Sequence, residues 1–377
     1  MSADKASSEE RKAFKNWFDR SAARALADQM AQAMPDFDQT RFVRLATRKL
    51  DSLEFAGRVK QFSDALAATL SESVPDALGT LTHSLPEPLA GCDETTDGWL
   101  QWPVGQFIAD HGLDHFEESM TAMVELTKRF SSEFAVRSFV EHRPQETFER
   151  LLALTADENP HVRRWCSEGT RSRLPWGRRL QHLVDDPSPI LPILEALKDD
   201  EELYVRRSVA NSLNDISKDH PDLAIEMGRA WSKKSSEHRQ WIVKHALRTL
   251  IKAGDADALA IVGFGQPTKL KAALCVRPKR IAIGGSVELT AELSNGAART
   301  QHLMVDYVVH YVRQRGQSSE KVFKWKSVEL SARSSTTLTK KHAMRLTTIR
   351  ALYPGMHRVQ LQVNGVRVGE TRFRLTG

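Results

Sequence analysis

The stretch Asn-Pro-His-Val-Arg-Arg-Trp-Cys-Ser-Glu-Gly-Thr at residues 159–170 returns in part at residues 203–216, which read Leu-Tyr-Val-Arg-Arg-Ser-Val-Ala-Asn-Ser-Leu-Asn-Asp-Ile. Val162 and Val205, each followed by two arginines, lie 43 residues apart. This period is typical of two-helix repeats of the HEAT type, whose copies stack into a solenoid. A looser third copy begins near Val243. We therefore predict a mainly α-helical, HEAT-like solenoid.

Outward from this motif, residues 10–262 read as one amphipathic helix after another. In the segment 54–70, apolar residues recur at spacings of three and four, and the segment 41–50 has a similar apolar side. The segment 99–108 is rich in aromatic residues and is expected to pack between helices. Proline-containing turn signals divide the helices from one another.

Near residue 266 the pattern changes from helical spacing to alternation of apolar and polar residues. Alternating segments occur at residues 286–293, 304–312, 322–328, 336–343 and 358–363. The pair Asn364-Gly365 is a strong signal for a two-residue hairpin turn. About seven short strands predict a small all-β, immunoglobulin-like sandwich without the usual disulfide. We expect two domains, at residues 1–266 and 267–377.

The charge of the chain is divided unevenly between these two parts. Residues 267–377 contain 20 Lys and Arg against 6 Asp and Glu, a net charge of +14, and the remainder has a net charge of −8. In the repeats, basic residues fall at the start of amphipathic helices. Together these features favour a long anionic partner such as nucleic acid, with a domain made basic for solubility as the alternative.

Other classes of protein fit the sequence poorly. It contains no run of about 18 apolar residues, and residues 1–11 lack the apolar core of a secretion signal. Cys92, Cys166 and Cys275 are too few and too far apart for a disulfide framework or a metal site, so we expect a reducing cytoplasm. His111 and His115 are four residues apart, but Gly112 between them disfavours a helical zinc site.

Several of these stretches resemble one family. Residues 132–137 (Ser-Glu-Phe-Ala-Val-Arg), 159–164, 167–171 and 174–176 (Leu-Pro-Trp) are similar to the DNA alkylation-repair glycosylases built from HEAT-like repeats, most of all to the AlkC type. The second copy of the motif, at residues 205–217, fits the same branch. The resemblance covers roughly residues 10–262. It implies excision of N-alkylated bases, chiefly 3-methyladenine, from duplex DNA in the bacterial nucleoid, and some AlkC-type members carry an added immunoglobulin-like domain.

Three carboxylates are candidates for the chemistry that the resemblance implies. An alkylated purine is cationic, so the reaction needs an anion beside the developing sugar cation and a positioned water, but no metal or other cofactor. The resemblance implies that Glu168 is the catalytic or lesion-contacting carboxylate, with Asp215 and Glu133 facing the lesion beside it. From the residues alone, an ion pair of Glu168 with Arg164 or Arg171 is the favoured interpretation, and the resemblance reverses that preference. Likewise, Asp215 could be a polar residue that ends its helix, and Glu133 a charge that favours a helix start.

One aromatic residue and six arginines complete the predicted site. Trp176 lies between Pro175 and Gly177 among basic residues, so its ring is expected to stack on a sugar or a cationic base rather than to join the core. Predicted contacts to DNA phosphates come from Arg163, Arg164, Arg171, Arg173, Arg206 and Arg207. For each Val-Arg-Arg pair, the alternative is that one arginine is solvated or salt-bridged.

Two main functions remain open at the level of sequence. The first is a monofunctional DNA glycosylase that acts on double-stranded DNA containing alkylated bases. The second is a non-catalytic nucleic-acid-binding solenoid, because HEAT arrays are commonly scaffolds. A protein-binding scaffold fits the basic β-domain less well. We expect a monomer with no membrane contact, since no coiled-coil or symmetric interface signal occurs.

Overall fold

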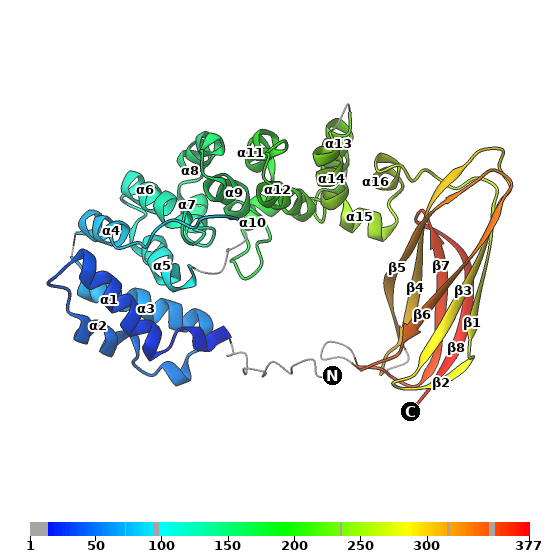
Figure 1. Ribbon diagram of the computed structural model, residues 1–377, viewed down its shortest axis with the longest axis horizontal. Helices are drawn as coiled ribbons and strands as arrows, with labels where there is room; N and C mark the ends of the chain where they lie inside the picture. The colour runs from blue at the N-terminus through cyan, green and yellow to red at the C-terminus, as the bar shows by residue number, and fades with distance from the viewer. Residues whose placement is uncertain (1–13, 72, 93–97, 234–235, 315–316, 347–350) are drawn as a thin grey trace, which may run out of the picture. The chain divides into compact units, whose positions relative to one another are not determined.

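The structure is a computed structural model that describes residues 14–71, 73–92, 98–233, 236–314, 317–346 and 351–377. The chain forms two compact units, the first ending at Asp219 and the second beginning at His220. Within the described residues, no helix is both long enough and apolar enough to cross a membrane. The order of the elements, helices first and strands after them, agrees with the predicted change of pattern along the chain (Figure 1).

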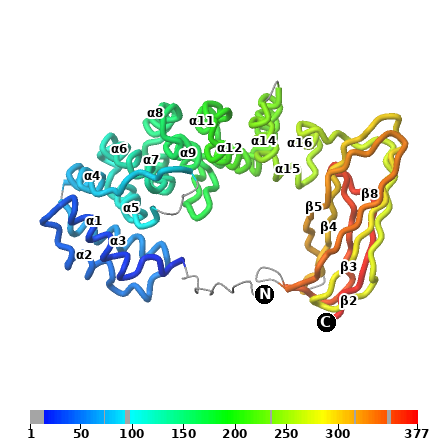
Figure 2. Tube along the Cα trace, viewed as in Figure 1, coloured from blue at the N-terminus to red at the C-terminus, as the bar shows by residue number. Residues whose placement is uncertain are grey.

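The first unit consists of helices. They are α1 (Arg20–Ala33), α2 (Gln39–Ala46), α3 (Phe55–Thr69), α4 (Val74–His83), α5 (Trp102–His111), α6 (Phe116–Thr127), α7 (Val136–His142), α8 (Pro144–Ala153), α9 (Pro160–Gly169), α10 (Gln181–Asp185), α11 (Leu191–Leu197) and α12 (Leu203–Ile216), with short 3₁₀ turns between some of them. Neighbours in sequence pack together, α7 with α8 and α11 with α12, while α9 packs against α6, α11 and α12. Figure 2 follows the chain through these helices in order.

Two predicted helix boundaries differ from the structure. The helix predicted at residues 41–50 is α2, which ends at Ala46 and is capped by Thr47, and Lys49 in the turn after it adopts a left-handed backbone conformation with φ of 55°. The helix start that was the alternative role for Glu133 lies at Val136, and Glu133 is in the turn before it. The aromatic segment 99–108 forms a short 3₁₀ turn and the first part of α5.

The second unit contains four helices and eight strands among its described residues. The helices are α13 (Pro221–Trp231), α14 (Glu237–Ala246), α15 (Arg248–Ala253) and α16 (Ala256–Ile261), and the strands are β1 (Leu270–Arg277), β2 (Arg280–Ala282), β3 (Ser286–Asn295), β4 (Gln301–Val312), β5 (Ser318–Leu330), β6 (Ser335–Ala343), β7 (Gly355–Val363) and β8 (Val366–Thr376). All five alternating segments of the sequence lie in strands. The predicted boundary near residue 266 falls between α16 and β1, whereas α13–α16 group with the strands by contact.

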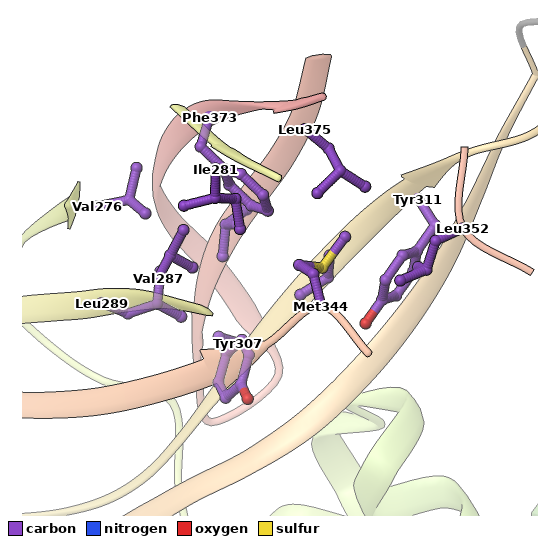
Figure 3. Close-up of a cluster of buried hydrophobic side chains, with 12 residues drawn as sticks. Val276, Ile281, Val287, Leu289, Tyr307, Tyr311, Met344, Leu352, Phe373 and Leu375 are labelled. Carbon is purple, nitrogen blue, oxygen red and sulfur yellow. The ribbon is translucent and has the colours of Figure 1, made fainter. Parts of the chain in front are cut away.

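The strands form two sheets around a common core. One sheet has the order β1-β3-β6 and the other β2-β8-β7-β4-β5, with every pairing antiparallel except β2 with β8. Side chains from both sheets, among them Val287, Tyr307 and Phe373, make one buried cluster (Figure 3). The turn predicted at Asn364-Gly365 is confirmed, because both residues have positive φ, 46° and 81°, and join β7 to β8.

Candidate active site

Helix α9 places two charged residues of the first motif copy on one face. The Asn159 side chain accepts a hydrogen bond from the His161 amide at 2.9 Å, and Pro160 occupies the first turn, so the helix starts at a defined residue. Arg164 and Glu168, four residues apart, therefore point the same way. The Nη2 atom of Arg164 lies 3.5 Å from Oε1 of Glu168.

The three predicted carboxylates belong to one chain of ion pairs. Arg164 Nη1 donates to Glu133 Oε2 at 2.5 Å, and Arg171 Nη1 donates to Glu168 Oε1 at 2.6 Å. The Nε atom of Arg171 donates to Asp215 Oδ2 at 2.8 Å. Acids and bases thus alternate from the turn before α7, through α9 and the loop after it, to α12. We call Glu133, Arg164, Glu168, Arg171 and Asp215 the ionic chain.

Burial and charge act in opposite directions on the acids of this chain. Glu168 is 5% exposed and Asp215 is 2% exposed. Burial disfavours the charged form of Glu168, but the guanidinium groups of Arg164 and Arg171 outweigh it and hold the pKa of this carboxyl below its usual range. Glu168 is therefore an anion at neutral pH in a site from which water is largely excluded.

The pKa of Arg164 shifts in the opposite direction to that of Glu168. Burial opposes the charge of Arg164, but Glu133 and Glu168 outweigh burial and raise its pKa. The guanidinium of Arg164 also lies 5.2 Å from the centre of the Tyr204 ring, and burial raises the pKa of that phenol. Tyr204 precedes the Val-Arg-Arg triplet of the second copy, so one copy of the motif supports the other.

The first arginine of each motif copy has the same internal role. Arg163 Nη1 donates to the carbonyl oxygens of Asp157 and Glu158 at 2.9 and 3.0 Å. Arg206 Nη1 donates to the carbonyl oxygens six and five residues before it, those of Asp200 and Glu201, both at 2.6 Å. Each arginine fixes the turn that precedes its own helix. Arg163 also bonds to Asp200 through two nitrogens, at 2.7 and 3.2 Å.

Most of the arginines predicted to bind phosphate are bonded within the protein. Arg163 and Arg206 are engaged by the protein itself, Arg163 by the Asp200 carboxylate and two carbonyl oxygens, and Arg206 by two carbonyl oxygens alone. Arg173 forms a two-point ion pair with Asp219 at 2.8 and 2.6 Å. Arg164 and Arg171 belong to the ionic chain, and Arg207 is exposed. As contacts to DNA, all six stay predictions.

Trp176 is an exposed aromatic residue in the loop after α9. Its side chain is 73% exposed, and its backbone has φ of 67°, a conformation that bulky residues rarely adopt. Its ring meets Phe14 edge-on at 4.9 Å. Trp176 belongs to a cavity of about 690 Å³, and other aromatic side chains in the wall include Phe55, Trp102 and Phe134.

Two residues that the sequence analysis did not single out connect this cavity to the ionic chain. Ser131 lines the cavity, donates to Glu133 at 3.0 Å and accepts from Arg164 at 3.2 Å. Arg137 is 2% exposed and donates to the carbonyl oxygens of Gly169 and Arg171 at 3.0 and 2.8 Å. Burial, and then the charges of Arg178 and Arg171, lower the pKa of Arg137 to about 10.

The sequence contains little that would mark Ser131 or Arg137 as site residues. Val136-Arg137 repeats only the first two residues of the Val-Arg-Arg motif, and a lone serine carries no pattern. Arg137 also joins the loop that bears Trp176, since its Nε donates to the Arg178 carbonyl at 2.9 Å. Only the packing of α7 against the loop after α9 brings Arg137 next to the candidate site.

The histidines of the weak zinc motif lie in different elements. His111 is the last residue of α5, Gly112 caps that helix, and His115 precedes α6. In the part of the chain that the structure describes, no group of three His, Cys, Asp or Glu side chains is arranged to hold a metal ion.

Two family models match separate segments of the chain. Residues 130–250 match the family described as DNA alkylation repair enzyme, and residues 271–377 match the C-terminal immunoglobulin-like domain of the uncharacterised protein YhaZ. YhaZ of Bacillus subtilis is 37% identical over 346 residues, which cover 90% of this chain and 93% of that protein.

A solved structure is similar over almost the whole chain. The alkylpurine DNA glycosylase AlkC of Pseudomonas fluorescens, bound to DNA containing an abasic-site analogue, is 35% identical with a TM-score of 0.87. The match covers 97% of this chain and all of that one. The chain therefore belongs to the AlkC-type family of DNA alkylation repair proteins, with a C-terminal immunoglobulin-like domain of the YhaZ type.

Proposed function

We propose that this protein is a monofunctional DNA glycosylase that hydrolyses the N-glycosidic bond of cationic N-alkylated bases, chiefly 3-methyladenine, in duplex DNA. The observation that carries the proposal is the ionic chain, which gathers Glu133, Glu168 and Asp215 beside a cavity with aromatic walls. The similarity to AlkC, a glycosylase solved on abasic-site DNA, supports it. The paired helices would be HEAT-like repeats, and residues 1–266 and 267–377 the two domains.

The chemistry needs little more than these residues. The bond between C1′ and the base nitrogen breaks, and its electron pair neutralises the cationic base, so the leaving group needs no proton. Positive charge develops on the sugar, where a fixed carboxylate stabilises it more than water would. A water oxygen then bonds to C1′ and gives one proton to a carboxylate or to solvent.

The three carboxylates divide these roles by exposure. The side chain of Glu133 is 13% exposed, and Glu133 accepts from Ser131 in the cavity wall, so it is the carboxylate that substrate and water reach first. Glu168 and Asp215 are deeper and orient the arginines, and Glu168 strengthens the negative potential at the sugar. Trp176 stacks on the sugar or the cationic base.

Binding of duplex DNA follows from the charge distribution. The C-terminal segment, with its net charge of +14, grips the phosphate backbone, and Arg207 adds an exposed cation on α12. The protein would act as a monomer.

The decisive experiment measures base release from methylated duplex DNA, with the freed base identified by chromatography. We compare the parent with Glu168→Gln and Asp215→Asn. Each variant is expected to lose at least about 100-fold in the single-turnover rate, because a preorganised charge is removed from the transition state. DNA binding should remain within a few-fold of the parent's. Glu149→Gln, on the exposed side of α8, is the matched control and should release base at the parent's rate.

Two results would contradict the proposal. If the parent releases no alkylated base but binds DNA tightly, the protein is a non-catalytic nucleic-acid-binding solenoid. If both variants release base as fast as the parent, these carboxylates are structural, and the chemistry lies elsewhere. A parent that releases only 7-methylguanine would correct the lesion while leaving the reaction in place.

A further inference from the structure

A hollow rich in arginine lies on the first two helices, within the first unit. It has a volume of about 960 Å³, and its wall includes Arg20 and Arg24 of α1 together with Arg44 of α2 and Arg48 of the turn after α2. The first residues of α2, Gln39 and Thr40, contribute polar side chains. No carboxylate stands among the described residues that line it.

The arrangement of these cations is unfavourable for the protein alone. Arg20 and Arg24 are four residues apart on α1, so these like charges are neighbours on one side of the helix. Arg44 of α2 and Arg48 of the turn after it line the same hollow. Helices α1 and α2 pack against each other, which brings the two pairs to one hollow. All four arginines are exposed. Four gathered cations without a facing anion store repulsion that an anionic ligand would relieve.

These four arginines differ from those of the ionic chain. Arg164, Arg171 and Arg173 each bond to a carboxylate of the protein. By contrast, Arg20, Arg24, Arg44 and Arg48 have no hydrogen bond or ion pair with another residue within the described ranges. Their guanidinium groups keep all their donors available, and a guanidinium binds phosphate oxygens at two points.

The rest of the wall indicates which nucleic acid fits. Apart from its polar and basic residues, the hollow presents Val43 and Leu45 and no aromatic side chain among its described residues. Single strands are usually held by stacking their bases on aromatic rings, whereas duplex backbones are held by cations and hydroxyl or amide donors. Thr40 and Gln39 supply donors of the second kind.

We propose that Arg20, Arg24, Arg44 and Arg48 form a phosphodiester-binding surface that holds the backbone of duplex DNA away from the damaged nucleotide. The proposal rests on the proposed function, because it assumes that the partner of the first unit is DNA. It adds a site separate from the ionic chain and from the basic C-terminal segment. Its role is affinity rather than chemistry, since none of these residues belongs to the cavity beside the ionic chain.

The test uses the full-length protein and an undamaged duplex of 30 base pairs. The dissociation constant is measured at several KCl concentrations for the parent and for the quadruple variant Arg20→Gln, Arg24→Gln, Arg44→Gln, Arg48→Gln. Each phosphate contact contributes about 0.9 to the slope of log affinity against log salt, so the slope should fall by about 2 to 4. Arg41→Gln, an exposed arginine of α2 outside the hollow, is the matched control and should keep the parent's slope.

Two further measurements separate this surface from the active site. The quadruple variant should unfold at the parent's temperature or slightly above it, because like-charge repulsion is removed. With enzyme in saturating excess, it should release base from methylated duplex at the parent's single-turnover rate. If the parent itself releases no base, the proposed function fails while the salt slope still decides about the surface.

Defined outcomes overturn the proposal. An unchanged salt slope in a folded quadruple variant shows that the hollow does not hold DNA. If that variant instead loses binding to poly-glutamate, the hollow accepts an acidic polypeptide. A fall in slope for Arg41→Gln as large as one quarter of that for the quadruple variant would mean that general charge, and not this hollow, is responsible.

Discussion

Helices α9 and α12 carry the same Val-Arg-Arg motif, but the two arginine positions of the motif have different bonding partners. Arg163 and Arg206 make matching bonds to the carbonyl groups five and six residues before them, so this position serves the repeat itself. Arg164 is enclosed by Glu133 and Glu168, whereas Arg207, at the same position of the second copy, is exposed. The first arginine of each copy stabilises the repeat. The second arginine belongs to the candidate site in the first copy only, as Arg164.

Substitution of the second arginine of the motif should have the greatest consequence, and only in the first copy. Arg164→Gln should lower the single-turnover rate of base release by about 100-fold or more, because Glu133 and Glu168 lose the cation that orders them. Arg207→Gln should change that rate less than about 3-fold, since Arg207 lies outside the ionic chain and saturating enzyme compensates for a lost phosphate contact. Similar losses in both variants, measured with saturating enzyme, would show that the two positions are equivalent.

The next effect tests the first arginine of each copy, through stability. Arg206→Met keeps the apolar stem but leaves two carbonyl oxygens without their charged donor, so the free energy of unfolding should fall by about 2–3 kcal/mol. Arg207→Gln should alter it by at most about 0.5 kcal/mol. Urea unfolding followed by circular dichroism measures both, and equal values for the two variants would remove the distinction between the positions.

A smaller effect concerns pH and the ionic chain. The folded pKa of Glu168 lies below its unfolded value, so its contribution to stability is present above about pH 4.5 and is lost as the pH falls through the lowered folded value. Urea unfolding between pH 3 and 6 should therefore show a steeper loss for the parent than for Glu168→Gln. Curves of equal steepness would mean that Glu168 is not held as an anion by its arginines.

The smallest expected change in stability concerns Asp306, a buried acid outside both copies of the motif. In β4, burial raises the pKa of Asp306 to about 6, although Lys324 opposes the shift. A raised folded pKa in an acid costs stability as the pH rises from about 4 to above 6, the reverse of Glu168. Asp306→Asn should therefore raise stability at pH 7 by about 1 kcal/mol and have no benefit at pH 4. A destabilised variant at pH 7 would contradict this assignment.

Local patterns were enough for the elements of the fold. Helical spacing at residues 54–70 corresponds to α3, and the alternating segments all lie in strands, because amphipathic periodicity reports which face of an element is buried. The pair Asn364-Gly365 marked its hairpin, since few other pairs accept positive φ at both positions. The end of α2 was missed, because the apolar spacing continues past Ala46 to Leu50, which lies in the 3₁₀ helix after the turn.

The period of the repeat, the change from helices to strands, the charge of each part and the candidate carboxylates and tryptophan all follow from the order of the residues. The partners of these side chains follow from the packing of the helices. Arg164 finds Glu133 across 31 residues, Arg171 finds Asp215 across 44, and Trp176 meets Phe14. An ion pair requires its atoms within about 4 Å, and that distance is set by how helices pack rather than by spacing along the chain.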